Sequence, residues 1–429
     1  MQSPATAGHP ASANIAGYFL NFFIWLMLAV SFFVHFEPAP VDVVFAIALL
    51  FFAKTRLSAV IGVVPLVILL LVYNLGGFMS FLQAPQQPKA MMFIITSSYM
   101  AVTGVVFALY VATDPAKHVR IIGIGWIFGA VIASIWGMVD YFNLPAPLPL
   151  QVLPGRATGY FKDPNVFSTY LIFPIVLMLQ TLILKQSKHP ILLSLSLFIC
   201  VIGLFLSFSR GAWASFVAAT VLMLVFTFFL CRDQRLRTRL ILFTIGGLII
   251  ATLTFMFLMS IPAIRTMFIE RFALVQYYDT GETGRFGNQL RSLPDLAARP
   301  FGYGPLVFRN IYGQDPHNTF LNAFASYGWF GGITYALLVI STFIIGLKSV
   351  FLRTPWQPMA IAVFCPLAST IMQGVQIDTE HWRHFYWLLG MMWGVYAASA
   401  HYARQPGIQA NAFRPTSPLT PVSQSRGQR

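Results

Sequence analysis

The residues best suited to chemistry lie between Asp315 and Asn318, where Asp-Pro-His-Asn follows a glycine-rich polar stretch and precedes a long apolar run. Pro is favourable at the first position of a helix and Asp is a good N-cap, so we expect a helix to begin here. His317 would then lie in the first turn, where the positive end of the helix dipole keeps imidazole neutral. A neutral base beside an anion-attracting helix end suits attack by a hydroxyl group on a phosphate-activated donor. The alternative is a histidine that caps a membrane helix at the interface.

Two other segments share this design, because Asp163-Pro164-Asn165 and Ser209-Arg210-Gly211 also precede apolar runs. If all three helices start on one side of a membrane, three positive dipole ends and Arg210 could meet near one point. Such a point would fit an anionic lipid head, for example a diphosphate. The alternatives are ordinary helix capping by Asp-Pro and snorkelling of Arg210 to phospholipid phosphates.

Two further polar segments carry candidate residues. The stretch from Arg285 to Ala298 is predicted to form a short helix with Phe286, Leu290, Leu293 and Ala297 on one face, and Arg285 taken alone is also typical of solvated surface.

Near the C-terminal end, Asp378, Glu380, His381 and His384 surround Trp382. Two His and nearby carboxylates are possible metal ligands, although a sugar-acceptor surface is an equal alternative. We expect no metal and no cofactor.

The composition predicts a polytopic membrane protein. Of the 429 residues, 57% are hydrophobic and 9% are charged, whereas soluble domains carry about 25% charged residues. The net charge of +14 is better explained by loops that face anionic lipid and cytoplasm than by nucleic acid, so membrane lipids are expected partners and nucleic acid is not. The three cysteines, Cys200, Cys231 and Cys365, have no spacing that indicates a metal site or disulfides.

The hydropathy pattern predicts an all-α fold of about 12 transmembrane helices, since a span needs roughly 20 apolar residues. The apolar segments are 14–36, 39–53, 57–79, 91–113, 119–142, 165–184, 190–208, 211–231, 240–260, 317–347, 357–376 and 384–402. The second is the shortest, and its crossing is needed to keep Lys54 and Arg56 on the cytoplasmic side. With both termini inside, most of the 27 Lys and Arg residues lie in predicted cytoplasmic segments, as the positive-inside rule expects.

This topology divides the chain into four parts. Residues 1–260 form transmembrane helices 1 to 9, residues 261–316 form a large external loop, residues 317–402 form helices 10 to 12, and residues 403–429 form a disordered cytoplasmic tail. No cleavable signal peptide is evident, because residues 1–13 lack Lys and Arg and the following apolar run is long.

Seven motifs in a fixed order carry a resemblance to a known family. They are Arg156-Ala157-Thr158-Gly159-Tyr160-Phe161, Pro164-Asn165, Ser209-Arg210-Gly211, Thr283-Gly284-Arg285, Gly302-Tyr303-Gly304-Pro305, His317-Asn318-Thr319-Phe320-Leu321 and Tyr327-Gly328-Trp329-Phe330-Gly331. Across residues 155–345 the chain resembles the O-antigen ligase and polymerase superfamily of bacterial membrane glycosyltransferases.

The resemblance implies a GT-C-like, multi-span helical fold with a large periplasmic loop in the bacterial inner membrane. It implies transfer of a glycan from undecaprenyl diphosphate to a sugar hydroxyl, without metal. Arg210 and Arg285 would hold the diphosphate, His317 would be the general base, and Arg156, Asn165 and Asn318 would support them. The partners implied are the lipid-linked donor and a carbohydrate acceptor, and chain-length regulators or export proteins are further candidates.

Two departures from the family pattern bear on the subfamily. Gly287 and Asn288 stand where an aromatic residue often follows the loop Arg, and Ser326 stands where a Glu is common after His-Asn. These departures favour a polymerase of O-antigen or exopolysaccharide repeats over a ligase that attaches glycan to lipid A core.

Two other classes of protein remain open. A flippase for lipid-linked sugar would explain many spans and a basic outer surface, but the spans carry almost no ionisable residues and the chain shows no inverted repeat. A non-catalytic scaffold in a polysaccharide export complex is the third alternative.

Overall fold

A computed structural model describes residues 11–53, 61–145, 155–272, 281 and 284–404, and every regular element in this part of the chain is a helix. The helices predicted from the apolar segments are α1 (Ala11–Ala29), α2 (Pro40–Phe52), α3 (Val64–Phe81), α4 (Ala90–Thr113), α5 (Pro115–Tyr141), α6 (Pro164–Ile183), α7 (Pro190–Leu206), α8 (Arg210–Leu230), α9 (Gln234–Met259), α13 (Thr319–Phe351), α14 (Gln357–Gln373) and α15 (Arg383–Ala403). Short helices add η1 (Ile61–Val63), α10 (Pro262–Phe272), α11 (Arg285–Ala297) and α12 (Phe308–Tyr312).

Each predicted apolar segment therefore overlaps a helix in the described residues, although several bounds differ. Seven helical stretches in the described residues are long and apolar enough to cross a membrane, and they include α3 to α6, α8, α9 and α13. The helix α2 has 13 residues, about 20 Å at 1.5 Å per residue, so it is too short to span a bilayer on its own. The chain is thus a multi-pass helical membrane protein, while the number of crossings and the sidedness of its loops stay predictions. Lys54, Arg56, Thr283 and the tail beyond Arg404 lie outside the described residues.

Capping residues set several helix starts that hydropathy places inexactly. The carboxylate of Asp114 accepts the N–H of Lys117 at 3.1 Å, so α5 begins at Pro115 rather than 119. Asp233 accepts the N–H of Arg235 at 2.9 Å, so α9 begins at Gln234 rather than 240. Both helices start with residues more polar than the apolar run that follows. Hydropathy therefore places these starts too late, because a helix begins at its cap hydrogen bond.

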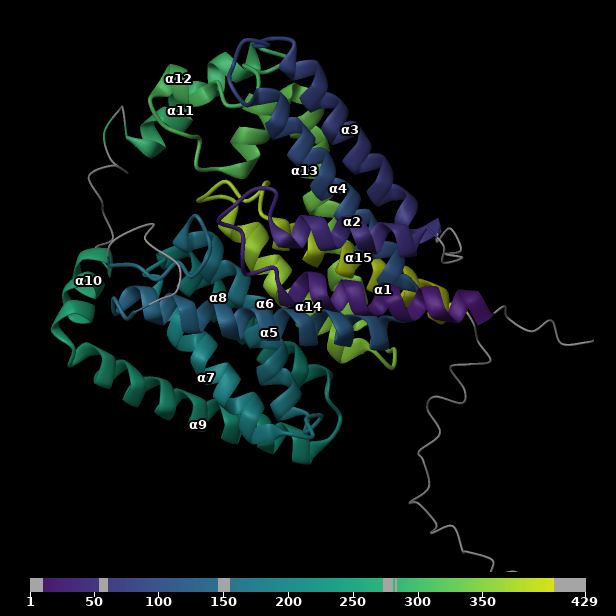
Figure 1. Ribbon diagram of the computed structural model, residues 1–429, viewed down its shortest axis with the longest axis vertical. Helices are drawn as coiled ribbons and strands as arrows, with labels where there is room; N and C mark the ends of the chain where they lie inside the picture. Colours follow the sequence, from purple (N-terminus) through teal and green to yellow (C-terminus); the bar gives the residue numbers. More distant parts are fainter. Residues whose placement is uncertain (1–10, 54–60, 146–154, 273–280, 282–283, 405–429) are drawn as a thin grey trace, which may run out of the picture.

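The helices pack into one body around a shared core (Figure 1). The closest pairs are α4 with α15 and α3 with α13, while α1 lies against α2 and α5, and α8 lies against α14. Helix α14 also contacts α6, α13 and α15, so it joins the two groups. The helix α9 runs along the outside and leads into α10 (Figure 1), and most of its apolar side chains are exposed, as expected for a surface that faces lipid.

The segment from α11 to α12 folds over the start of α13 (Figure 1) and forms a small second core with it. The indole N–H of Trp329 donates to the Leu296 carbonyl at 3.0 Å, and the N–H of Tyr303 donates to the Ala325 carbonyl at 2.9 Å. The predicted helix from Arg285 is confirmed as α11.

The face of α11 that turns toward the protein differs from the apolar stripe. Asn288, Ser292 and Leu296 are buried, whereas Phe286 and Leu290 are exposed. The reason is that Asn288 donates to the Tyr312 carbonyl at 3.0 Å and pins this polar face inward.

The helix α13 is interrupted at Gly328, whose φ of 67° and ψ of −169° lie outside the helical region. The N–H of Trp329 instead donates to the Pro300 carbonyl at 2.8 Å. A Cβ at position 328 would lie 2.6 Å from that carbonyl oxygen, so the close approach and the positive φ both require glycine. The break lets the loop before α12 lie directly against the helix.

Candidate active site

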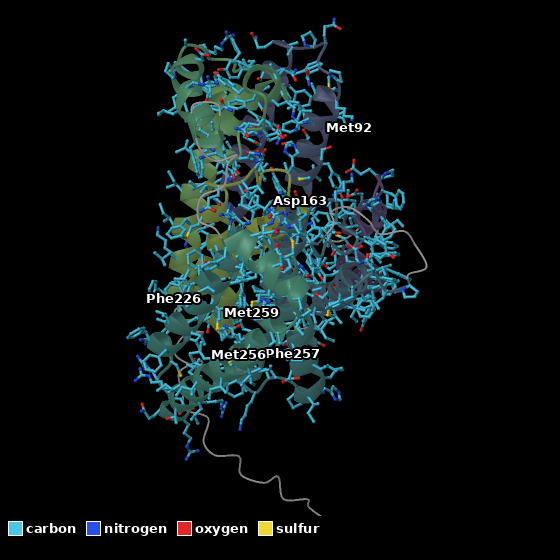
Figure 2. All side chains as sticks on the ribbon, turned by 90° about the vertical axis from the view of Figure 1, so that its left-hand side faces the viewer. Met92, Asp163, Phe226, Met256, Phe257 and Met259 are labelled. Atoms are coloured by element: carbon cyan, nitrogen blue, oxygen red, sulfur yellow. The ribbon has the colours of Figure 1, made fainter. Side chains whose placement is uncertain are left out.

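The starts of α6 and α8 are built as the sequence predicts. Asp163 caps α6 by accepting the N–H of Asn165 at 2.5 Å, with Pro164 at the first helical position. Ser209 caps α8 by accepting the N–H of Ala212 at 3.4 Å, and Arg210 is the first residue of that helix. In Figure 2, Asp163 lies below Met92 and above Met259.

Arg156 joins these two helix starts. Its Nε donates to the carbonyl of Ser207 at 2.8 Å, and its Nη2 donates to Oδ1 of Asn165 at 3.2 Å. The predicted supporting residues Arg156 and Asn165 are therefore in contact, and they bring Arg210 toward the start of α6. Arg156 as a whole is half-buried.

The start of α13 corrects the prediction for Asp315 and His317. Asn318 is the N-cap, and its Oδ1 accepts the N–H of Leu321 at 3.1 Å. His317 lies one residue before the cap with φ of 49°, outside the first turn. Asp315 does not cap the helix because its carboxylate pairs with Arg309. The histidine still lies next to the positive end of α13, where an anion is stabilised.

Asp378 holds the chain in this conformation. One carboxylate oxygen accepts the N–H of His317 at 3.0 Å, and the other accepts the N–H of Asn318 at 3.0 Å. Burial, together with the nearby carboxylate of Glu380, raises the pKa of Asp378, and the two backbone N–H groups oppose this rise.

The segment from Gln373 to Glu380, which we name the bridging segment, connects all these helix starts. Oε1 of Gln373 accepts hydrogen bonds from Thr169 in α6 and Ser215 in α8, each at 3.1 Å. The carbonyl of Gly374 accepts the N–H of Thr319 in α13 at 2.7 Å. Three helices far apart in the sequence thus converge on the end of α14.

Arg285 reaches the same segment from α11. Its Nη2 donates to the carbonyl of Gln376, and its guanidinium lies 5.4 Å from the centre of the Phe286 ring. The bridging segment thus contacts Arg285 and His317 directly, and through Ser215 it contacts α8, the helix that begins at Arg210. Arg210, Arg285 and His317 are half-buried, as are Arg156, Asn165 and Asn318.

The bridging segment also supplies a buried carboxylate beside Ser326. Glu380 is 2% exposed and accepts a hydrogen bond from the side-chain amide of Asn322. The hydroxyl of Ser326 donates to Oδ1 of that Asn322 at 2.8 Å. A carboxylate therefore lies near the position where Ser326 departs from the family pattern, although it comes from another part of the chain.

Sequence reasoning named Asp378 and Glu380 only as possible metal or sugar ligands and missed Gln373 and Gln376. Among the described residues, His, Cys, Asp and Glu side chains nowhere gather in a group of three that could hold a metal ion. In the sequence, the only indication that Asp378 belongs to a site is its position in a polar loop between two apolar segments. Nothing in the sequence pairs it with His317, because the partners are 61 residues apart.

Comparison with known proteins agrees with the motif resemblance. Residues 195–336 match the family model described as O-Antigen ligase, which confirms the resemblance to the O-antigen ligase and polymerase superfamily. The match includes Arg210, Arg285 and His317 and ends within α13. A search of curated proteins finds no match to the chain. The likeness is thus to a family of O-antigen ligases, which supports a glycosyltransferase-type activity.

Proposed function

We propose that the protein is an inner-membrane glycosyltransferase that moves a glycan from undecaprenyl diphosphate to a sugar hydroxyl at the periplasmic face. The observation that carries this proposal is the attachment of His317, Arg285 and the start of α8 to one bridging segment. Within this proposal, residues 261–316 form a large periplasmic loop over the site, and both chain termini lie in the cytoplasm.

In this reaction His317 takes the proton of the acceptor hydroxyl as the new glycosidic bond forms. The bond between the donor sugar and the diphosphate breaks, and the leaving diphosphate carries the negative charge that develops. Arg210 and Arg285 stabilise that charge, helped by the positive ends of α6, α8 and α13. No metal ion takes part in the proposed step.

The surroundings of Arg285 suit a lipid-linked donor. This residue starts α11, and the next turns carry the exposed apolar side chains of Phe286, Leu290 and Leu293. A diphosphate held by Arg285 would place its polyprenyl chain along this apolar face, because both the chain and the face avoid water.

The polymerase and the ligase differ only in their acceptor. We propose a polymerase of O-antigen or exopolysaccharide repeats, supported by the two departures from the family pattern at Gly287–Asn288 and Ser326. A ligase would use lipid A core as the acceptor at the same site.

Complementation of a gene deletion tests the proposal. Wild type, His317→Ala, Arg210→Ala and Arg285→Ala are expressed at equal protein level, and lipopolysaccharide and secreted polysaccharide are compared on gels. We expect wild type to restore a product and all three variants to lose it. Loss of all capped lipopolysaccharide would indicate a ligase, and loss of chain length alone would indicate a polymerase. Lys in place of either Arg should fail to rescue, since it lacks the planar fork that binds phosphate oxygens.

Turnover by purified protein in detergent separates the transferase from the alternatives. A transferase forms product without a sealed membrane, whereas a flippase has no measurable activity there. A scaffold would keep its function in the cell when His317 is replaced by Ala, so a fully active His317→Ala variant would reject the assignment of the base.

A further inference from the structure

A pocket of about 180 Å³ opens between the segment after α1, the start of α6 and the start of α15. This volume holds about six water molecules, which is the space of one sugar ring rather than of a lipid. Aromatic side chains form much of its wall, including Phe161, Tyr170, Trp382 and Trp387. Aromatic faces cover the C–H faces of sugar rings, while polar groups at the rim bind the hydroxyls.

Both cations at this pocket are paired with a carboxylate. Nζ of Lys162 lies 2.6 Å from a carboxylate oxygen of Glu37. Arg383 forms two hydrogen bonds with Asp42, at 3.0 and 2.8 Å. Asp163 also lines the pocket, and its carboxylate accepts the N–H of Asn165. Because Lys162 and Arg383 each have a carboxylate partner already, neither of these cations is left to bind an anion. Paired charges of this kind still offer donors and acceptors to a neutral, hydroxyl-rich ligand.

Two histidines that line the pocket have enclosed nitrogen atoms without a hydrogen-bond partner in the described part of the chain. These atoms are Nδ1 of His381 and Nε2 of His384, and His384 is 2% exposed. The other ring nitrogen of His381 contacts the Phe93 carbonyl at 3.2 Å, which fixes that ring. Nδ1 of His381 lies 3.8 Å from a carboxylate oxygen of Glu380. Buried polar groups normally have a partner, so the unpaired Nε2 of His384 at the pocket wall indicates a ligand or water that completes it.

The pocket adjoins the candidate active site along two separate segments. Asp163 lines the pocket, and Asn165, two residues later, contacts Arg156. His381 lines the pocket directly after Glu380, the last residue of the bridging segment. The pocket and the candidate active site therefore share two segments of the chain, the start of α6 and the residues around Glu380.

We propose that this pocket is a carbohydrate-binding site that holds one neutral sugar residue of a glycan substrate, separate from the residues that perform the transfer. Its role as a subsite of the reaction rests on the proposed function, whereas its binding of sugar does not. The sugar could belong to the donor or to the acceptor, and the experiment distinguishes the two.

Binding is measured by saturation-transfer NMR on the full chain in detergent. The neutral probes are methyl glucoside, methyl galactoside and N-acetylglucosamine, and the charged probes are glucuronate and inorganic phosphate. The pocket variants are His384→Phe, which keeps a ring of similar size, and Lys162→Ala on the exposed rim. Lys89→Ala removes an exposed charge outside the pocket and serves as the matched control.

We expect wild type and Lys89→Ala to bind a neutral sugar, and both pocket variants to lose affinity about tenfold with unchanged melting temperature. The proposal is overturned if no neutral sugar binds to wild type, if charged probes bind in preference, or if both pocket variants bind as well as wild type. An equal loss in Lys89→Ala would also overturn it, because binding would then follow net charge alone.

Two comparisons keep this test apart from the test of the proposed function. His317→Ala should lose transfer but keep sugar binding, so loss of binding there would contradict a separate pocket. If His317→Ala is active in transfer and wild type binds a neutral sugar, the proposed transfer mechanism is rejected, whereas the proposed sugar-binding pocket is retained. Inhibition of transfer by the bound sugar should be competitive with the substrate that uses the pocket, which identifies donor or acceptor.

Discussion

The carboxylate of Asp378 accepts the backbone N–H of His317 at 3.0 Å, and so sets the position of the proposed base from a separate segment of the chain. His317 has φ of 49°, a conformation that costs an L-residue roughly 1–2 kcal/mol. The second carboxylate oxygen binds the N–H of Asn318, the N-cap of α13. One side chain thus fixes both the strained residue and the helix start, which predicts that Asp378 acts on the reaction through position.

Replacing Asp378 with Asn tests this role. The side-chain NH₂ would face the N–H of either His317 or Asn318, so one buried hydrogen bond is replaced by two opposed donors. We expect a loss of stability of about 1–3 kcal/mol and at least a tenfold fall in transfer rate. Thermal unfolding and turnover in the same detergent measure the two effects.

Asp315→Asn is the matched control, because that carboxylate lies on the same side of α13 but pairs with the exposed side chain of Arg309. Its effect on stability should stay below about 1 kcal/mol, as for surface ion pairs. Equal effects of the two substitutions would mean that general charge near the loop, and not the contact with His317, is responsible.

The raised pKa of Asp378 predicts a pH dependence of stability. Its ordinary value is near 3.8, and the folded protein keeps the proton to higher pH than the unfolded chain does. Because the folded state binds more protons in this window, stability should fall as pH rises from the ordinary value through the raised one. Melting curves across this range should show the fall in wild type and a flatter profile in Asp378→Asn. A stability that rises with pH to the same extent in wild type and in Asp378→Asn would contradict the raised pKa of Asp378.

Local sequence signals predicted the helices and two of the three helix starts at the site. Asp163 and Ser209 cap their helices because a short polar side chain before an apolar run bonds to nearby N–H groups, an interaction within three residues. The same reasoning failed at Asp315. Its carboxylate pairs with Arg309, and Asn318 takes the cap position instead.

The connections between helices could not be predicted from the sequence. Gln373 lies 204 residues from Thr169 and 158 from Ser215, and neither spacing carries a periodic signal. The apolar stripe of α11 was recognised, but its direction was not, because the contact of Asn288 with Tyr312 decides which face turns inward. Side chains that act over long sequence separations therefore define the site.

The break in α13 predicts a strong effect at Gly328. Ala at this position would have φ near 67° and a Cβ within 2.6 Å of the Pro300 carbonyl oxygen. We expect Gly328→Ala to lower stability by more than about 1 kcal/mol and to reduce transfer, since the loop over α13 must move. Gly246→Ala in α9 is the control, because nothing lies within 4 Å of that position. It should be neutral or stabilise by about 1 kcal/mol, and similar melting curves for the two variants would contradict the prediction.

The contacts of Gln373 with α6 and α8 can be tested by comparing substitutions at two buried glutamines, Gln373 and Gln180. Gln373→Leu leaves the hydroxyls of Thr169 and Ser215 without their shared acceptor, so we expect a loss of about 1–3 kcal/mol. The starts of α6 and α8 should then separate, which raises the KM for the lipid-linked donor because Arg210 no longer lies near the bridging segment.

Gln180→Leu in α6 is the matched control, since Nε2 of this buried side chain has no partner among the described residues. That substitution removes an unpaired polar group and should leave stability unchanged or higher. Melting temperature and donor KM are measured for both, and a donor KM that rises equally in both variants would show that Gln373 supports the fold without positioning the site.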